Sequence, residues 1–331
     1  MNPGRTLLAP QPKRHSNPNG ATMFKFKKLT LVCGIAALAL STGAHAEAKK
    51  IGLAVANLQA EFFNMIKQSV EAYGKEKGYT IITVDAKGDA TTQVNQIQDL
   101  LTQKVDALIY IPAGATAASV PVKAARAAGI PVVNVDRNAE GAPGDTFIHG
   151  ESLKATTELA EWICKQSGGK GNAVVIHGQK GTSPEVDRFK GWMAGLSKCP
   201  AVKVTQNQFT ERWAADEGNK IAQDMLQRDP TINIIFGQAD GIALGAAQAV
   251  KLAKPSQKTW VVGYDGDIGG LKAVQSGGLD ATVTQPTFTM GRMAVDAVTD
   301  LLAGKKPPAD QPMDGVLTTK ENVEKFLKAH P

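Results

Sequence analysis

GIPVVNVDR, residues 129–137, is the stretch that decides the predicted fold. A Gly-Ile-Pro turn leads into a mostly apolar, β-branched run at 132–135, which ends in an acid and a base, Asp136 and Arg137. Such runs are typical of strands in parallel sheets that are covered by helices on both faces. Ligands bind these sheets at the carboxyl ends of the strands. The pair is therefore either a surface salt bridge or part of a binding site.

The same pattern continues along most of the chain. Short β-branched runs alternate with segments of helical period from residue 50 to residue 304, which predicts an α/β fold with parallel sheets. At 331 residues the chain exceeds the usual size of one core, so we expect two lobes, with a break at the turn-forming residues 139–145. Strands are predicted at 51–56, 80–84, 107–111, 132–135, 173–176, 202–204, 232–236, 260–263 and 281–283, and helices at 62–77, 91–103, 115–128, 153–165, 213–228 and 241–252.

The first 46 residues have the composition of a leader. From Met23, a basic start precedes an apolar stretch and the small-x-small end Ala44-His45-Ala46, the pattern of a secretory signal peptide. Residues 1–22 are polar and precede a second methionine, so we expect translation to start at Met23, cleavage to follow Ala46, and the mature chain to be exported. A membrane anchor is the weaker alternative, because the apolar stretch is shorter than the roughly 20 residues that span a bilayer.

The formal net charge of +6 lies in this leader. Residues 1–46 hold six basic residues and no acidic ones, which leaves 31 of the 37 bases against 31 acids. Surfaces that bind nucleic acid or anionic membranes need clustered Lys and Arg. Neither partner is expected.

Two cysteines, Cys164 and Cys199, remain once the leader has taken Cys33 with it. In an exported chain they permit one disulfide. Both lie near the ends of successive predicted helices, which adjacent βα units can place side by side at one sheet edge. The alternative is two separate, buried thiols.

Motifs for catalysis or cofactor binding are absent from the sequence. It has no GxxxxGK[ST] phosphate loop, no GxGxxG after the first strand, no GxSxG elbow and no HExxH or CxxC cluster. The remaining histidines, His149, His177 and His330, are too scattered for a metal site. We expect a binding protein without a cofactor or metal rather than an enzyme.

Polar residues that follow predicted strands are the candidate ligand contacts, since the carboxyl ends of parallel strands share one cleft. Carboxylate, guanidinium and amide groups occur there beside aromatic rings. This mixture suits a neutral polyhydroxylated ring, whose hydroxyls donate to carboxylates and accept from guanidinium groups. For the two phenylalanines, core packing at a helix start is the alternative. The set comprises Asp136, Arg137, Arg188, Asp265 and Gln285 with Phe62, Phe63, Trp213 and Tyr264.

Seven ordered segments carry a resemblance to a known family: AEFF at 60–63, GIPVVNVDR at 129–137, GTSPEVDRFKGW at 181–192, FTERWAADEG at 209–218, IIFGQADGIALGA at 234–246, VVGYDG at 261–266 and ATVTQP at 281–286. Over residues 49–317 the chain resembles the ribose-type periplasmic sugar-binding proteins of ABC importers. The resemblance implies a type 1 periplasmic binding fold, with two Rossmann-like lobes joined by a three-segment hinge. The expected lobes are residues 47–150 with 286–312 and residues 151–285 with 313–331.

The resemblance also implies roles for single residues. The family's stacking positions fall on Phe62, Phe63 and Trp213, and its Asp-Arg pair falls on Asp136 and Arg137. Three further polar contacts fall on Arg188, Asp265 and Gln285. Additional candidates beside these are Asn57, Glu61, Asp240 and Tyr264.

Two positions depart from the family pattern. Ala60, followed by Glu61, stands where the family usually has Asn or Asp, and Ala239 stands where it has Asn. Each lost contact removes on the order of a kcal/mol for a matching hydroxyl. Besides ribose, the candidate solutes therefore include a hexose, a pentose of different stereochemistry, a polyol and a cyclitol.

These features predict a monomeric periplasmic receptor that captures a small neutral sugar, polyol or cyclitol and delivers it to an inner-membrane ABC permease. One alternative is a sensory receptor that signals to a membrane chemoreceptor or kinase. Another is an exported enzyme, which would need a nucleophile or an acid–base pair in the cleft. The effector lobe of a transcription regulator shares the fold, but the signal peptide and the missing amino-terminal DNA-binding helices argue against it.

Overall fold

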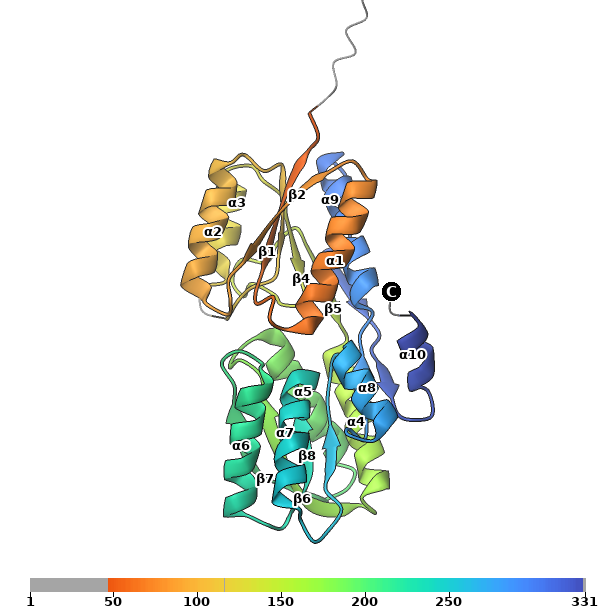
Figure 1. Ribbon diagram of the computed structural model, residues 1–331. Helices are drawn as coiled ribbons and strands as arrows, with labels where there is room; N and C mark the ends of the chain where they lie inside the picture. The colour runs from red at the N-terminus through yellow and green to blue at the C-terminus, as the bar shows by residue number, and fades with distance from the viewer. Residues whose placement is uncertain (1–46, 116, 330–331) are drawn as a thin grey trace, which may run out of the picture. The chain divides into compact units, whose positions relative to one another are not determined.

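The computed structural model describes residues 47–115 and 117–329 (Figure 1). The predicted leader, its start at Met23 and its cleavage after Ala46 lie outside the described residues. Among the described residues, no helix has the length and apolar character needed to cross a membrane.

The first sheet consists of six parallel strands in the order β11-β5-β4-β3-β1-β2. The β-branched runs supply its centre, where β1, β3 and β4 are almost entirely buried. The strands span β1 Lys50–Val55, β2 Thr80–Asp85, β3 Ala107–Tyr110, β4 Val132–Val135, β5 Thr146–Gly150 and β11 Asp310–Met313.

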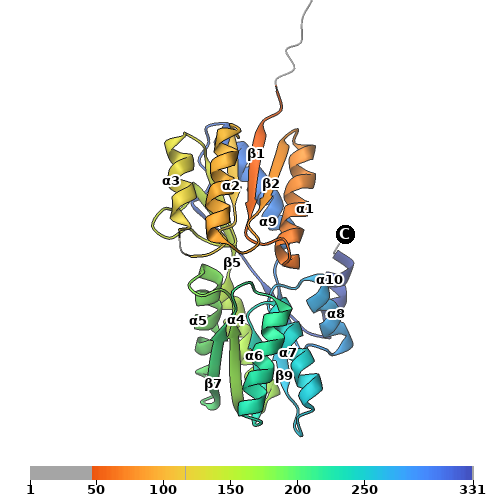
Figure 2. The ribbon, with the colours of Figure 1, turned by 60° about the vertical axis from the view of Figure 1, so that its left-hand side comes forward.

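Helices cover both faces of the first sheet (Figures 1 and 2). On one face α1 and α9 pack side by side, with Ile66 and Ala294 in the same core cluster as the strands. On the other face α2 and α3 contribute Leu100 and Val122 to a second cluster. The helices span α1 Glu61–Glu76, α2 Ala90–Thr102, α3 Ser119–Ala127 and α9 Thr287–Leu302.

The second sheet has four parallel strands in the order β7-β6-β8-β9. One face carries α4 and α5, and the other carries α6, α7 and α8. Its elements span α4 Ser152–Gln166, β6 Lys170–His177, α5 Ser183–Leu196, β7 Ala201–Phe209, α6 Ala215–Arg228, β8 Ile232–Gly237, α7 Asp240–Ala253, β9 Trp260–Val262 and α8 Ile268–Ser276.

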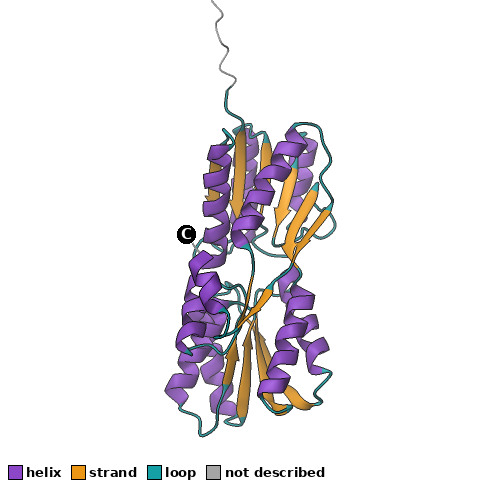
Figure 3. Cartoon of the chain, turned by 90° about the vertical axis from the view of Figure 1, so that its right-hand side faces the viewer, coloured by secondary structure: helices purple, strands orange, loops and turns teal. Residues whose placement is uncertain are grey.

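The chain passes between the two sheets three times, from β5 to α4, from β10 (Thr282–Thr284) to α9, and from β11 to β12 (Val316–Thr318). The last two passages lie together, because β10 and β12 pair antiparallel, and α10 (Val323–Ala329) then packs against α8. Figure 3 shows these connecting segments between the two groups of strands. The predicted fold class, two α/β lobes with parallel sheets and a three-segment connection, is confirmed.

Several element boundaries differ from those predicted. Strand β7 continues to Phe209 through four consecutive polar residues, 205–208, since it is an edge strand that is largely exposed to solvent. Helix α3 begins at Ser119 rather than at 115. Helix α6 begins at Ala215, because Trp213 has a φ of 62°, in the left-handed region.

A disulfide joins Cys164 to Cys199, with the Cα atoms 6.1 Å apart, and links the end of α4 to the segment after α5.

Candidate binding pocket

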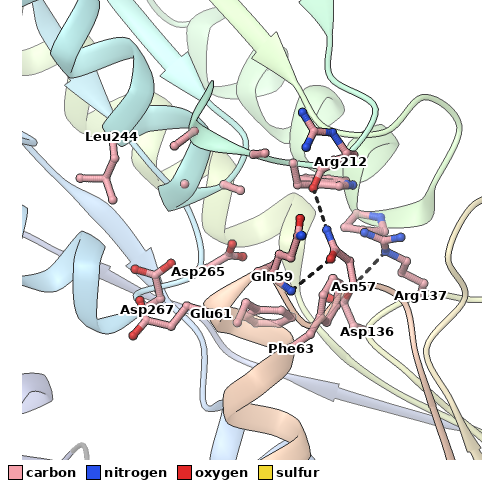
Figure 4. Close-up of a pocket in the computed structure, with 18 of the residues that line it drawn as sticks. Asn57, Gln59, Glu61, Phe63, Asp136, Arg137, Arg212, Leu244, Asp265 and Asp267 are labelled. Carbon is pink, nitrogen blue, oxygen red and sulfur yellow. Dashed lines mark hydrogen bonds and ion pairs between the residues drawn. The ribbon is translucent and has the colours of Figure 1, made fainter. Parts of the chain in front are cut away.

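A pocket of about 230 Å³ lies at the carboxyl ends of strands from both sheets (Figure 4). This volume is below the roughly 300–1,000 Å³ of sites for drug-sized ligands and suits a smaller solute. Polar and aromatic side chains dominate its wall. They are Asn57, Gln59, Glu61, Phe62, Phe63, Asp136, Arg137, Arg188, Arg212, Trp213, Asp265 and Asp267.

The loop after β1 forms one wall of the pocket. Asn57 shapes this loop by accepting a hydrogen bond from the Gln59 amide at 3.1 Å, and its Nδ2 donates to the Arg212 carbonyl at 3.4 Å. Phe62 and Phe63 follow in the first turn of α1, and their rings meet edge to face with centroids 5.3 Å apart. Both rings are buried and both line the pocket, so they combine core packing with a place in the wall.

Asp136 and Arg137 lie at the carboxyl end of β4 and are buried rather than exposed on the surface. The Asp136 Oδ2 lies 3.6 Å from the Arg137 Nε. Arg137 is held in place because its Nη1 donates to the Pro112 carbonyl at 2.9 Å. Burial lowers the pKa of Arg137 to about 10, which leaves it charged at neutral pH, and burial raises the pKa of Asp136 against the effect of Arg137.

Arg188 and Asp265 form a second buried pair, on elements of the second sheet. The Arg188 Nη2 lies 3.3 Å from the Asp265 Oδ1, and its guanidinium lies 3.9 Å over the centroid of the Tyr264 ring. Asp265 has a φ of 124° and follows β9. Burial raises the pKa of Asp265 to about 8, although Arg188 opposes the shift. With this pKa the carboxyl can carry a proton at neutral pH, and it can then donate a hydrogen bond as well as accept one.

Trp213 lies between the two arginines. The Cζ atoms of Arg137 and Arg188 are each 5.4 Å from its ring centroid. Its six-membered ring packs on the backbone of Gly178, where a Cβ would collide with it. Three buried donors in this part of the wall have no hydrogen-bond partner in the described chain, namely the Arg137 Nε, the Arg188 Nε and the Trp213 Nε1. They are available to acceptor atoms of a bound molecule.

Nine of the twelve candidate residues line the pocket: Asn57, Glu61, Phe62, Phe63, Asp136, Arg137, Arg188, Trp213 and Asp265.

The other three candidates do not line it. Tyr264 is fully buried in the core cluster of the second sheet, and its ring packs against the guanidinium of Arg188. Asp240 is also fully buried and accepts hydrogen bonds from the Gly266 and Asp267 amides and from the Thr282 hydroxyl. Gln285 lies behind Asp265 and donates to its Oδ1 at 3.1 Å.

Beside Pro184 and several small residues, the structure adds four larger side chains that the sequence did not single out: Gln59, Arg212, Leu244 and Asp267. Two of these four residues lie close in sequence to predicted site residues and could have been found in that way. Arg212 directly precedes Trp213, and Asp267 lies two residues beyond Asp265. No group of three or more metal-ligating side chains is found among residues 47–115 and 117–329.

Comparison with known proteins places the chain among solute receptors. The family model described as periplasmic binding protein domain matches residues 51–306. The ribose import binding protein of Bacillus subtilis is 32% identical over 77% of this chain and 82% of its own length. The xylitol-binding protein of Mycolicibacterium smegmatis is 32% identical over 86% and 80%. A solute-binding protein of Bacillus halodurans, solved with bound myo-inositol, superimposes with a TM-score of 0.80 at 25% identity over 85% and 98%.

Proposed function

We propose, from the premise that this chain belongs to the periplasmic binding protein domain family, that it is a periplasmic receptor for one small sugar, polyol or cyclitol, which it delivers to an ABC permease. The relatives support this solute class. They are named for the import of ribose and for the binding of xylitol, and a similar structure holds myo-inositol.

One observation carries the proposal: two buried carboxyl–arginine pairs flank an aromatic ring in a pocket of monosaccharide size. Asp136 with Arg137 and Asp265 with Arg188 supply both acceptors and donors. The unpartnered Nε atoms of the two arginines would meet hydroxyl oxygens, while Trp213 would cover the C–H face of a ring. We infer that the nine candidates lining the pocket contact the solute directly and that Gln285 acts through Asp265.

We further propose that the pocket opens and closes by a hinge at the three chain passages, between a lobe of residues 47–150 with 286–312 and a lobe of residues 151–285 with 313–331. The support is that the pocket draws its wall from loops of both sheets. A solute held on both sides favours the closed state by its differential affinity for that state. In this proposal the receptor works as a monomer and changes no covalent bond of its solute. The chain is exported, and its leader is cleaved off after Ala46.

Calorimetric titration of residues 47–331 tests this function. The chain is unfolded and refolded to remove carried-over solute and is then titrated with pentoses, hexoses, polyols and inositols. We expect micromolar or tighter binding to one class. Arg137→Ala should abolish the binding, whereas Arg228→Ala, on the exposed end of α6, should leave it unchanged. Absence of binding to every solute in the panel, or binding that survives Arg137→Ala, would contradict the proposal.

A further inference from the structure

One end of the pocket holds two acidic residues that belong to neither of the two carboxyl–arginine pairs. Glu61, in the first turn of α1, and Asp267, the N-cap of α8, both line the pocket. The Gly269 amide donates to the Glu61 Oε2 at 3.2 Å, and the Gly270 amide donates to the Asp267 Oδ1 at 2.7 Å. Figure 4 shows the two carboxylates side by side, away from Arg137.

Neither carboxylate has a cation beside it. Asp136 and Asp265 each face an arginine, but Glu61 and Asp267 form no ion pair with any described residue. Behind them lies a further acid, Asp240, which is fully buried, and its pKa is raised well above the usual value by burial and by the neighbouring charges of Asp267 and Asp265. Burial raises the pKa of Asp267 to about 6, and the charge of Glu61 and a hydrogen bond between the two side chains act in the same direction.

The first turn of α8 stabilises these charges but does not neutralise them. Each glycine amide gives one hydrogen bond to one oxygen, and a helix N-terminus acts as only about half a positive charge. The other groups lining this region, Ala60, Ala239 and Leu244, have no side-chain donors. A solute group placed here therefore meets acceptor oxygens and negative charge. A positively charged hydrogen-bond donor complements both.

The opposite end of the same pocket presents hydrogen-bond donors and requires acceptors. The Nε atoms of Arg137 and Arg188 and the Nε1 of Trp213 are buried donors that form no hydrogen bond with any described residue, on residues that are 3%, 2% and 8% exposed. Hydroxyl or ring oxygens of a solute satisfy them. The two ends thus select different groups on one molecule.

We propose that the preferred solute is a polyhydroxylated ring with one protonated amine, an aminosugar or an aminocyclitol, whose ammonium lies between Glu61 and Asp267 while its hydroxyls meet the arginines. This inference rests on the proposed function and narrows its solute class. The ammonium group supplies three donors and a full positive charge to two carboxylates that otherwise receive backbone amide hydrogen bonds and have no cationic partner among the described residues.

Paired titrations at pH 7 test the inference. Each aminosugar or amino-inositol is compared with its neutral parent, for example glucosamine with glucose, galactosamine with galactose and an inosamine with the matching inositol. We expect one amine to bind about tenfold or more tightly than its parent, which corresponds to the strength of one charge-assisted contact. Glu61→Gln and Asp267→Asn, each alone, should lower this ratio severalfold or more, while Glu76→Gln on the exposed face of α1 leaves it unchanged.

The possible results separate the inference from the proposed function. Equal or tighter binding of the neutral parents, or an amine preference that persists in both variants, would overturn the amine site and leave a sugar receptor standing. Silence for amines and parents alike would overturn both. Because Asn retains the capping oxygen of Asp267 and Glu61 is partly exposed, we expect both variants to fold, which circular dichroism checks; Glu61→Gln alone decides the matter if Asp267→Asn does not fold.

Discussion

At the scale of single residues, the place of Trp213 depends on the absence of a side chain at Gly178. A methyl group there would occupy the space of the six-membered ring. We predict that Gly178→Ala displaces the ring and weakens solute binding about tenfold or more, the loss of roughly one aromatic contact. Titration calorimetry measures the affinity, and Trp fluorescence reports the ring environment.

Gly278→Ala is the matched control for that change, because a Cβ at Gly278 would meet only atoms of Ala273 at 3.6 Å or more. It should leave the affinity unchanged. If Gly178→Ala binds as tightly as the native chain, Trp213 is not positioned by this contact.

Asp265 gives a prediction about pH. Its pKa is about 8 in the folded chain and near 3.8 in the unfolded chain, so between these two values the folded state holds a proton that the unfolded state has lost. Its contribution to stability is therefore present below pH 4 and is lost as the pH rises toward 8. We predict that the free energy of unfolding of the native chain, relative to Asp265→Asn, falls between pH 5 and pH 8, by at most about 1.4 kcal/mol per pH unit.

Urea denaturation of both solute-free proteins across this range provides the measurement. The two curves would run parallel if Asp265 were ionised throughout. Only the difference between the proteins is informative, because Asp136, Asp240 and Asp267 also have raised pKa values.

Much of the pocket could be predicted from residue order, because the carboxyl ends of parallel strands converge whatever their distance in sequence. Side-chain direction was harder to predict. Tyr264 and Asp265 are neighbours, yet one supports the site from the core and the other lines it. Asp240 resembles a strand-end ligand but binds backbone amides of the next loop, and only the folded chain brings those amides to it.

At the scale of elements, the strands that could be predicted are those with local signals. The run at Val132–Val135 and its counterparts are β-branched and buried, and the structure has strands there. β5, β11 and β12 were not predicted, because each mixes polar with apolar residues, and β11 contains a proline. β11 becomes a strand by pairing with β5, some 160 residues earlier, which no local pattern encodes.

The disulfide between Cys164 and Cys199 gives a prediction at this scale. It closes a loop of 35 residues through α4, β6 and α5. We predict that the double variant Cys164→Ser, Cys199→Ser loses about 3–4 kcal/mol of unfolding free energy without a change in solute affinity. Both cysteines lie next to the amino-terminal ends of β6 and β7, at the edge of the sheet away from the pocket.

Chemical reduction of the native chain should reproduce the stability of this double variant. A loss of affinity in the variant would mean that the disulfide positions the pocket as well as the sheet.

At the scale of the whole molecule, the pocket ties together two sheets that otherwise have separate cores. A solute bound by loops of both sheets should stabilise both at once. At a concentration 100 times the dissociation constant, we predict about 2.7 kcal/mol of added stability. In hydrogen exchange, amides in the loops after β1 and β4 and in those after β6, β7, β8 and β9 should slow together on addition of solute. Protection confined to the loops of one sheet would show that the solute binds one lobe without closing the pocket, and would contradict the hinge.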